Sequence, residues 1–312
     1  MCQRRKSVKH LLGLRELEVS DIESVLSLAV EMKKILKQNV KKTNHLSNKS
    51  VVTLFYENST RTKTSFEIAA KFMGASLSGI SVAQSSVQKG ETLIDTGKTL
   101  DALCTDVIII RHNVSGAPHF LAKNINASVI NGGDGMNEHP TQALLDIFTI
   151  IEERGSLKGL NVAIVGDVKH SRVARSNLWG MTKLGAKVTL AAPDTLMPEG
   201  IERAGARITT DADAAVRGAD VVMGLRLQLE RMKSGLIPSI SEYNEMYGLS
   251  KRRVGLADKD VMILHPGPVN RGAEINGDVA DADNSFIERQ VTNGVAIRMA
   301  ALFLLTRGNN PI

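Results

Sequence analysis

Hydroxyl and guanidinium side chains stand together where a predicted strand gives way to a predicted helix. The helix lies in NSTRTKTSFEIAAKFMGA, residues 58–75, directly after the apolar run VVTLF, residues 51–55. Its first turn carries Ser59, Thr60, Arg61 and Thr62. Free N–H groups, the positive helix end, hydroxyls and a guanidinium together can bind a phosphate. Helix capping, worth about 1 kcal/mol, is the simpler interpretation, but a capping hydroxyl needs no arginine beside it.

Other polar side chains share this position, directly after a predicted strand. The set comprises Arg111 and His112, His139 and Gln142, Arg172, Arg226 and Gln228, and the stretch from His265 to Pro268. Open parallel sheets bind ligands outside the carboxyl ends of their strands, so these groups are expected to converge on one anion-binding cleft. Taken singly, Arg172 and Arg226 could be surface arginines and Lys89 a solvated loop residue. His265, which precedes a proline, is expected to be structural.

The elements that must position these groups alternate along the chain. Predicted strands are VVTLF, ASLSGI, DVIIIRH and ASVINGG, then LNVAIVGD, AKVTLAAP, ARITT, ADVVMGL and VMILHPGP. Amphipathic stretches between them predict helices, beginning with VSDIESVLSLAVEMKKIL, for which Ser20 is the expected N-cap. Strands that alternate with helices imply parallel sheets covered on both faces.

The predicted fold class is therefore α/β, with two doubly wound domains. Each domain is a mainly parallel sheet flanked by helices, and the active site is expected in the cleft between the domains. The first domain is placed at residues 1–148 and the second at residues 149–284. A last helix, residues 285–306, is expected to pack back on the first domain.

Composition excludes several functional classes. The chain has 312 residues, a formal net charge of +6 and only 4% aromatic residues, and its basic residues form no long run, so nucleic-acid binding is not expected. AIVGDVKHSR lacks GxGxxG, and no GxxxxGK[ST] is present, which argues against NAD and P-loop nucleotides. We expect no cofactor and no metal. Cys2 and Cys104 form no disulfide framework, and no signal or membrane segment is recognised, so a cytoplasmic location is expected.

Several stretches, taken in order, resemble one family. FYENSTRTKTSFE, SVQKGETLIDT, IIIRH, HPTQALLD, GDVKHSRVARS, LRLQLERM and HPGPVNRGAEI look like the catalytic chains of aspartate carbamoyltransferases, a branch of the aspartate/ornithine carbamoyltransferase family. The matches run from about residue 51 to 275. STRT and HPTQ mark transcarbamylases generally, whereas RLQ and HPxP point to the aspartate branch.

The resemblance implies a role for each matching residue. The phosphate of carbamoyl phosphate would be bound by Ser59, Thr60, Arg61, Thr62 and Arg111. The carbamoyl oxygen would be held by Thr62, Arg111 and His139, and the carbamoyl nitrogen by Gln142. Glu57 would orient an arginine. The α-carboxylate of L-aspartate would meet Arg172, and its side-chain carboxylate would meet Arg226 and Gln228.

The resemblance also implies a homotrimer with shared active sites. Ser86 and Lys89 would reach into the site of a neighbouring chain, with Ser86 preferred over Ser85. Gly267 and Pro268 occupy a loop where the family often has leucine in place of the glycine, and a backbone carbonyl there can still meet the attacking amine. Whether regulatory chains or other pathway enzymes join the trimer stays open.

The chemistry follows from these groups. The deprotonated amine of aspartate attacks the carbamoyl carbon, donors aimed at the carbamoyl oxygen act as an oxyanion hole, and phosphate leaves. Cationic side chains offset the repulsion between two anionic substrates, and they orient the reactants. Two alternatives remain: transfer to another amino acid such as ornithine, and a catalytically silent structural subunit. Arg226 would repel the ammonium group of ornithine, and every cationic position is intact.

Overall fold

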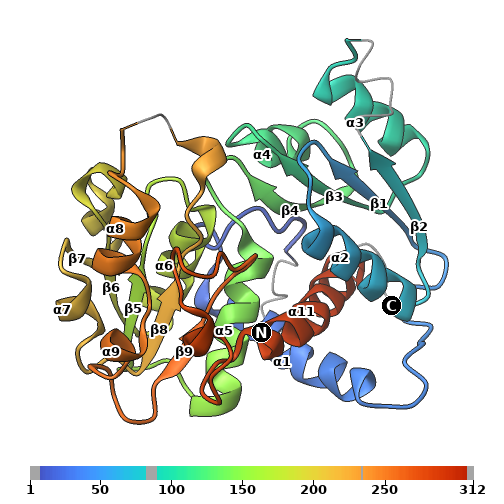
Figure 1. Ribbon diagram of the computed structural model, residues 1–312. Helices are drawn as coiled ribbons and strands as arrows, with labels where there is room; N and C mark the ends of the chain where they lie inside the picture. The colour runs from blue at the N-terminus through green and yellow to red at the C-terminus, as the bar shows by residue number, and fades with distance from the viewer. Residues whose placement is uncertain (1–7, 82–89, 233–234, 308–312) are drawn as a thin grey trace, which may run out of the picture. The chain divides into compact units, whose positions relative to one another are not determined.

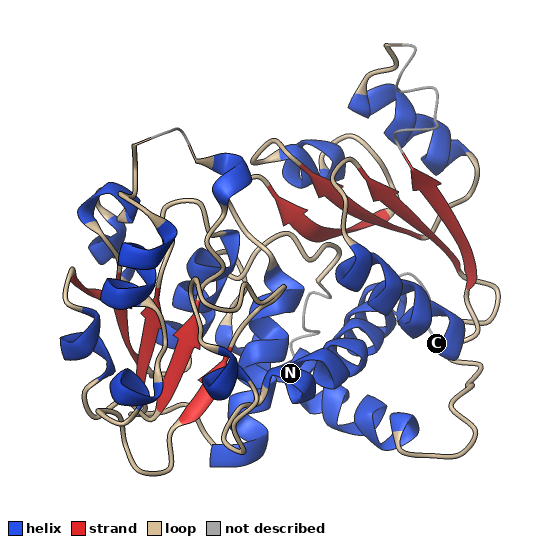
Figure 2. Ribbon diagram, in the orientation of Figure 1, coloured by secondary structure: helices blue, strands red, loops and turns tan. Residues whose placement is uncertain are grey.

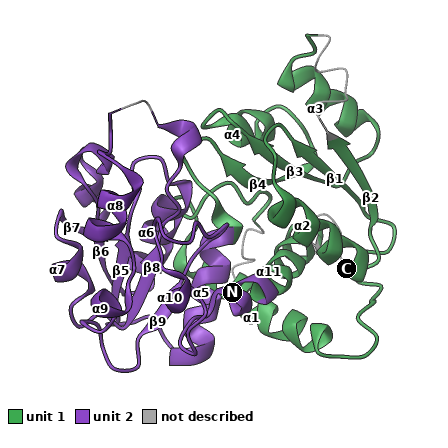
Figure 3. Cartoon of the chain, in the orientation of Figure 1, with its two compact units in different colours: residues 1–141, 293–312 green, residues 142–292 purple. Residues whose placement is uncertain are grey.

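The computed structural model describes residues 8–81, 90–232 and 235–307. Helices and strands alternate along the chain (Figures 1 and 2). The residues divide into two compact units, Met1–Thr141 with Asn293–Ile312, and Gln142–Thr292 (Figure 3). Each unit contains a parallel sheet flanked by helices, so the predicted α/β fold class is confirmed.

The first unit contains a parallel sheet with the strand order β2-β1-β3-β4. Its strands are β1 (Ser50–Phe55), β2 (Ser76–Ser81), β3 (Val107–His112) and β4 (Ser128–Asp134). Its helices are α1 (Val19–Leu36), α2 (Thr60–Phe72), α3 (Leu93–Ala102), α4 (Ala117–Ala122) and most of α11 (Ile287–Arg307). Because all four strands are parallel, their carboxyl ends lie at the same edge of the sheet.

Alternate residues of these strands face opposite sides of the sheet. One face forms a core cluster with α3 and α4 that contains Val52, Leu54, Ile108, Ile110, Leu100 and Leu121. A Cβ atom at Gly97 of α3 would lie 2.3 Å from Cδ1 of Leu121, so glycine permits the close approach of α3 and α4. In the same unit, the Arg298 guanidinium of α11 lies 5.0 Å from the ring centre of Phe66, so α11 packs against α2.

The second unit contains a parallel sheet with the strand order β7-β6-β5-β8-β9. Its strands are β5 (Asn161–Val165), β6 (Lys187–Ala191), β7 (Arg207–Thr209), β8 (Val221–Gly224) and β9 (Met262–Leu264). Its α-helices are α5 (Pro140–Arg154, from Gln142 on), α6 (Arg172–Lys183), α7 (Ala212–Val216), α8 (Ile240–Tyr247), α9 (Lys251–Val254), α10 (Gly277–Ala280) and the start of α11. The 3-10 helices are η3 (Asp194–Leu196), η4 (Ile201–Ala204) and η5 (Leu229–Arg231).

One local prediction is wrong. Ser20 does not cap α1, because the helix begins at Val19 and Glu18 is the N-cap residue. The backbone N–H of Glu18 donates to the Asp21 carboxylate at 3.2 Å, so an acidic residue in the first turn satisfies the backbone at the helix start. In the part of the chain that the structure describes, no helix combines the length and the apolar character needed to cross a bilayer.

Candidate active site

The loop between β1 and α2 places the first group of site residues. Ser59 is the N-cap residue of α2, with extended backbone (φ −159°, ψ 94°), but its side chain makes no capping hydrogen bond within the described residues. Its Oγ accepts a hydrogen bond from Nη1 of Arg111 at 3.2 Å. The first turn of α2 carries no acidic side chain that would offset the positive end of the helix dipole. The hydroxyl of Ser59 therefore serves Arg111 and not the helix.

Arg111 reaches this loop from the end of β3, where it is the register partner of Phe55 in β1. Its Nε donates to Oε2 of Glu57 at 3.2 Å, and its Nη1 also lies 3.5 Å from Oγ1 of Thr62. The side chains of Arg111 and Glu57 are 15% and 20% exposed. One guanidinium thus joins β3, the β1–α2 loop and the first turn of α2.

His139 lies on the other side of the Thr62 hydroxyl. Its Nε2 is 3.4 Å from Oγ1 of Thr62, and both residues are buried. The segment before His139 is fixed by the buried carboxylate of Asp134, which accepts the backbone N–H of Glu138 at 3.1 Å. Thr62 therefore contacts both Arg111 and His139.

The first unit therefore brings together Ser59, Thr62, Arg111 and His139. Thr60 and Arg61 are exposed in the first turn of the same helix. Hydroxyls and a guanidinium at a helix N-terminus can bind a phosphate group. A guanidinium and an imidazole around one hydroxyl can also stabilise negative charge on a carbonyl oxygen.

In the second unit, the loop after β5 carries Arg172. Ser171 caps α6 by accepting the N–H of Ala174 at 3.1 Å, and Arg172 is the first helical residue, with only 5% of its surface exposed. Asp167 in the same loop is fully buried and accepts both the backbone N–H and the Nδ1 of His170, at 3.1 and 2.9 Å. Arg172 is thus a buried cation at the start of α6, next to a loop that a buried carboxylate holds in shape.

Gln228 ties the loop after β8 to this loop. Its backbone N–H donates to Oδ2 of Asp167 at 3.3 Å, and its Nε2 donates to the carbonyl of His170 at 3.2 Å. The side chain of Gln228 therefore lies beside the segment that bears Arg172.

Arg226, in the same loop as Gln228, holds a carboxylate of its own chain. Its two Nη atoms donate to Oε1 and Oε2 of Glu230 at 2.7 and 3.0 Å. Burial alone would raise the pKa of Glu230, but hydrogen bonds from Arg226 and the backbone, with the charges of Arg226 and Arg231, outweigh it and lower that pKa. The guanidinium is therefore presented in the bidentate geometry that suits a carboxylate.

The HPGP loop follows β9. His265 is buried, its Nδ1 accepts the backbone N–H of Gly267 at 2.8 Å, and its Nε2 lies 3.2 Å from Oε1 of Glu274. The Gly267–Pro268 peptide bond is cis, and Gly267 has a φ of +62°, a conformation that glycine adopts without strain. His265 thus fixes the loop that presents Gly267 and Pro268.

Three residues that the sequence analysis considered for the site lie outside the described part of the chain: Ser85, Ser86 and Lys89. Among the described residues, no group of three or more His, Cys, Asp and Glu side chains could hold a metal ion.

Sequence reasoning named Glu57 but missed other carboxylates that hold the site side chains and their loops. Asp167 lies just after β5, in the sequence VGDVKH. Because the basic site residues were identified by the same position after a strand, that position could also have identified Asp167. Glu230 lies four residues after Arg226, a spacing at which opposite charges meet on one helical turn. The position of Glu274 gave no comparable signal, because its contact with His265 depends on the path of the loop.

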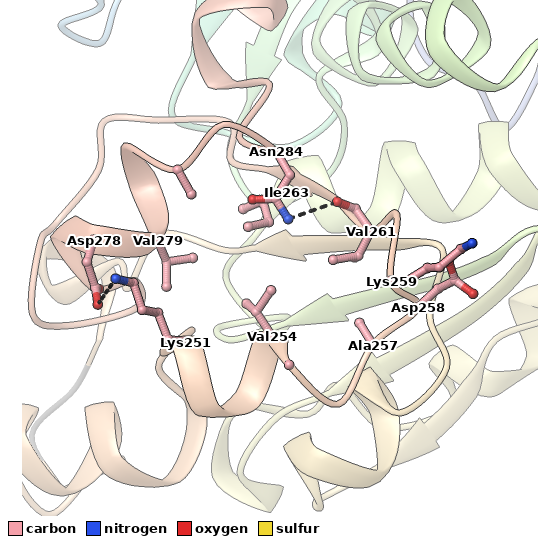
Figure 4. A pocket seen from close by; sticks show the side chains of 12 residues that line it. Lys251, Val254, Ala257, Asp258, Lys259, Val261, Ile263, Asp278, Val279 and Asn284 are labelled. Carbon is pink, nitrogen blue, oxygen red and sulfur yellow. Dashed lines mark hydrogen bonds and ion pairs between the residues drawn. The ribbon is translucent and has the colours of Figure 1, made fainter.

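A pocket of about 270 Å³ in the second unit is separate from these groups (Figure 4). It is lined by residues of α9, β9, α10 and the adjoining loops, and none of the predicted site residues lines it. Lys251 pairs with Asp278 at 3.6 Å, and Asn284 donates to the carbonyl of Val261 at 3.1 Å. Lys251, Asp278 and Asn284 are thus engaged in contacts within the unit, and the predicted site residues lie elsewhere.

Comparison with known proteins shows the class of protein to which this fold belongs. A model of the aspartate/ornithine carbamoyltransferase carbamoyl-P binding domain matches residues 9–152, and a model of the Asp/Orn binding domain of that family matches residues 158–305. The chain belongs to the aspartate/ornithine carbamoyltransferase family.

Individual relatives come from both branches of this family. The aspartate carbamoyltransferase catalytic subunit of Ruminiclostridium cellulolyticum is 61% identical over 299 residues, which cover 96% of each chain. An aspartate transcarbamoylase of Trypanosoma cruzi, in complex with carbamoyl phosphate and aspartate, is 30% identical with a TM-score of 0.85 over 96% of this chain and 97% of that one. The ornithine carbamoyltransferase of Pyrococcus furiosus is also 30% identical, with a TM-score of 0.86 over 97% and 99%. Backbone similarity therefore does not distinguish a chain that acts on aspartate from one that acts on ornithine.

Proposed function

We propose that this chain is the catalytic subunit of an aspartate carbamoyltransferase. It transfers the carbamoyl group of carbamoyl phosphate to the amino group of L-aspartate, giving N-carbamoyl-L-aspartate and phosphate, a step of de novo pyrimidine biosynthesis. The observation that carries the proposal is the contact of the Arg111 guanidinium with the hydroxyls of Ser59 and Thr62 at the start of α2. The similarity to the R. cellulolyticum subunit supports the choice of aspartate.

Carbamoyl phosphate binds mainly to residues of the first unit. Its phosphate group meets the N-terminus of α2, where the hydroxyls of Ser59, Thr60 and Thr62 donate hydrogen bonds to it. The guanidinium groups of Arg61 and Arg111 offset its charge. The carbamoyl oxygen faces Thr62, Arg111 and His139, and the contacts of Thr62 with Arg111 and with His139 support this assignment. Gln142, in the first turn of α5, meets the carbamoyl nitrogen.

Aspartate binds to the residues of the second unit. Arg172 takes the α-carboxylate, and Arg226 with Gln228 takes the side-chain carboxylate. The bidentate pair of Arg226 with Glu230 supports this role, since the same fork accepts a substrate carboxylate in the same geometry. Backbone carbonyls of the loop at Gly267 and Pro268 accept from the amine.

The reaction needs no covalent bond between the enzyme and the substrate. The neutral amine of aspartate forms the new C–N bond, the carbamoyl oxygen takes on negative charge, and the C–O bond to phosphate then breaks. The leaving phosphate accepts the proton that the amine loses. Donors already aimed at the oxygen stabilise this charge, and removal of one such donor typically costs about 3 kcal/mol.

We further propose a cytoplasmic homotrimer in which Ser86 and Lys89 complete the site of a neighbouring chain. Support comes from the presence of SVQKG in the order that marks the family.

Parallel assays with L-aspartate and L-ornithine test the function. Purified protein is expected to release phosphate from carbamoyl phosphate with aspartate and not with ornithine. Turnover with ornithine alone would assign the chain to the other branch of the family. Absence of turnover with either amino acid, in a protein that is folded, would indicate a silent subunit.

A further inference from the structure

Asp146, in the middle of α5, is a fully buried carboxylate bonded to three side-chain amides. Its Oδ1 accepts from Nε2 of Gln142 at 2.9 Å and from Nε2 of Gln290 at 2.7 Å. Its Oδ2 accepts from Nδ2 of Asn177 at 2.7 Å. The three amides come from α5, α11 and α6, all within the second unit.

This arrangement fixes which way the amide groups turn. A carboxylate only accepts hydrogen bonds, so the NH₂ groups of Gln142 and Gln290 must face Asp146 and their carbonyl oxygens must face elsewhere. Gln290 fits this rule independently, because its Oε1 accepts the backbone N–H of His265 at 3.0 Å. Gln142 obeys the same rule, which leaves its Oε1 as the atom it can offer to a ligand.

The chemistry of the ligand requires that same atom. The carbamoyl nitrogen carries an NH₂ group, a donor that needs an acceptor, and a glutamine turned the other way would oppose it with a second NH₂. We propose that Asp146 is a positioning residue that fixes Gln142 with its carbonyl oxygen toward the carbamoyl NH₂ group. This inference rests on the proposed function, since it concerns the site of carbamoyl phosphate.

The two oxygens of Asp146 supply a matched comparison. Oδ1 holds Gln142, and through Gln290 it also supports the loop that begins at His265. Oδ2 holds Asn177, which belongs to the packing of α6. A change at Asn177 therefore disturbs the same buried carboxylate without removing the donor–acceptor pair that orients Gln142.

A double-mutant cycle measured by calorimetric titration with carbamoyl phosphate tests the proposal. Asp146→Asn replaces one acceptor oxygen by a donor, so the Kd for carbamoyl phosphate is expected to rise by roughly tenfold. In a Gln142→Ala background, the same substitution is expected to change the Kd by less than about twofold, because its effect acts through Gln142. If the Kd of the double variant rises by the product of the two single-variant factors, the two residues act independently and the proposal is overturned.

Asn177→Ala is the control. It is expected to lower the melting temperature while the Kd for carbamoyl phosphate stays within about twofold of the unsubstituted protein. A loss of binding as large as that of Asp146→Asn would mean that any damage to the cluster weakens the site, and would refute a specific role for Oδ1.

A reciprocal exchange covers the case in which Asp146→Asn alone does not fold. Gln142→Glu sets a carboxylate against Asp146 and is expected to weaken binding. Combining it with Asp146→Asn restores a donor facing an acceptor and returns one carboxylate to the cluster, so binding should recover by roughly fivefold or more over Gln142→Glu alone. No recovery in the folded double variant would contradict the pairing.

Assays of the unsubstituted protein distinguish a failure of the proposed function from a failure of the proposed role of Asp146. If it neither binds carbamoyl phosphate nor carbamoylates aspartate, the proposed function fails and the role of Asp146 falls with it. If it does both and the cycle is multiplicative, only the assignment of Asp146 is wrong.

Discussion

Arg111 and Glu57 form an ion pair, with Nε of the arginine 3.2 Å from Oε2 of the glutamate, that joins the end of β3 to the loop after β1. Both side chains are largely buried, so the pair is less screened than a surface salt bridge. Nη1 of Arg111 is thereby directed to Ser59 and Thr62. Glu57 thus orients the guanidinium without itself belonging to the set of donors.

Glu57→Ala is expected to lower kcat/KM for carbamoyl phosphate by about tenfold, because Arg111 loses the acceptor that fixes its plane. Glu57→Gln keeps an oxygen acceptor at the same distance and is expected to retain most of the activity. Steady-state kinetics of both variants, with melting temperatures, make the comparison. Equal losses in the two would show that the charge of Glu57 matters and not its hydrogen bond.

The strands and the positions of the basic residues could be predicted because both depend on local sequence. DVIIIRH contains a β-branched run that is followed by Arg111 and His112, so the end of a strand and a cation are specified by the same seven residues. VVTLF and ADVVMGL specify β1 and β8 in the same way.

Contacts between distant residues could not be predicted from local sequence, and only the family resemblance indicated that Glu57 orients an arginine. The contact of Arg111 with Glu57 joins residues 54 apart in sequence, and that of Asp146 with Gln290 joins residues 144 apart. Such pairs depend on how strands and helices pack, which no local pattern encodes. The start of α1 was missed for another reason, since Ser20 is a preferred N-cap residue and Glu18, which occupies the N-cap position, is not.

Arg226→Gln is expected to raise KM for aspartate by about 100-fold, because the bidentate fork is lost. The Kd for carbamoyl phosphate should be unchanged, since the substitution lies among the aspartate-binding residues. Initial rates at saturating carbamoyl phosphate measure the first quantity and calorimetry the second. Arg252→Gln, which removes an arginine that is 63% exposed in the same unit, is the control and should leave both constants unchanged. An unaltered KM for aspartate in Arg226→Gln would remove Arg226 from the site.

Asp213 predicts a pH dependence of stability. Hydrogen bonds from Arg252 and, to a smaller extent, from Arg253 lower the pKa of Asp213 from 3.8 to about 2. A carboxyl group whose pKa is lower in the folded state stabilises the fold above its unfolded pKa, and this contribution is lost as the pH falls through the folded pKa. After allowance for solvent screening, the contribution near neutral pH is about 1 kcal/mol.

Asp213→Asn should therefore reduce the free energy of unfolding at pH 7, and the difference from the unsubstituted protein should shrink between about pH 4 and pH 2. Urea titrations across that range measure it. Asp281→Asn breaks an ion pair with Arg271 in which both side chains are more than half exposed, and it should have little effect at any pH. A constant difference between Asp213→Asn and the unsubstituted protein down to pH 2 would contradict the assignment.

Sharing of sites between chains can be tested by mixing two inactive variants. Arg61→Ala removes a cation from the first turn of α2, and Lys89→Ala removes the residue proposed to enter from the neighbour. Each variant alone should lose nearly all activity while folding normally. In a mixed trimer, roughly one site in three combines the intact Arg61 of one chain with the intact Lys89 of the next. Unfolding and refolding the variants together should thus restore activity, whereas mixing Lys89→Ala with Lys89→Gln should not. Mixed trimers, verified by mass, that stay inactive would place Lys89 in the site of its own chain or outside the site altogether.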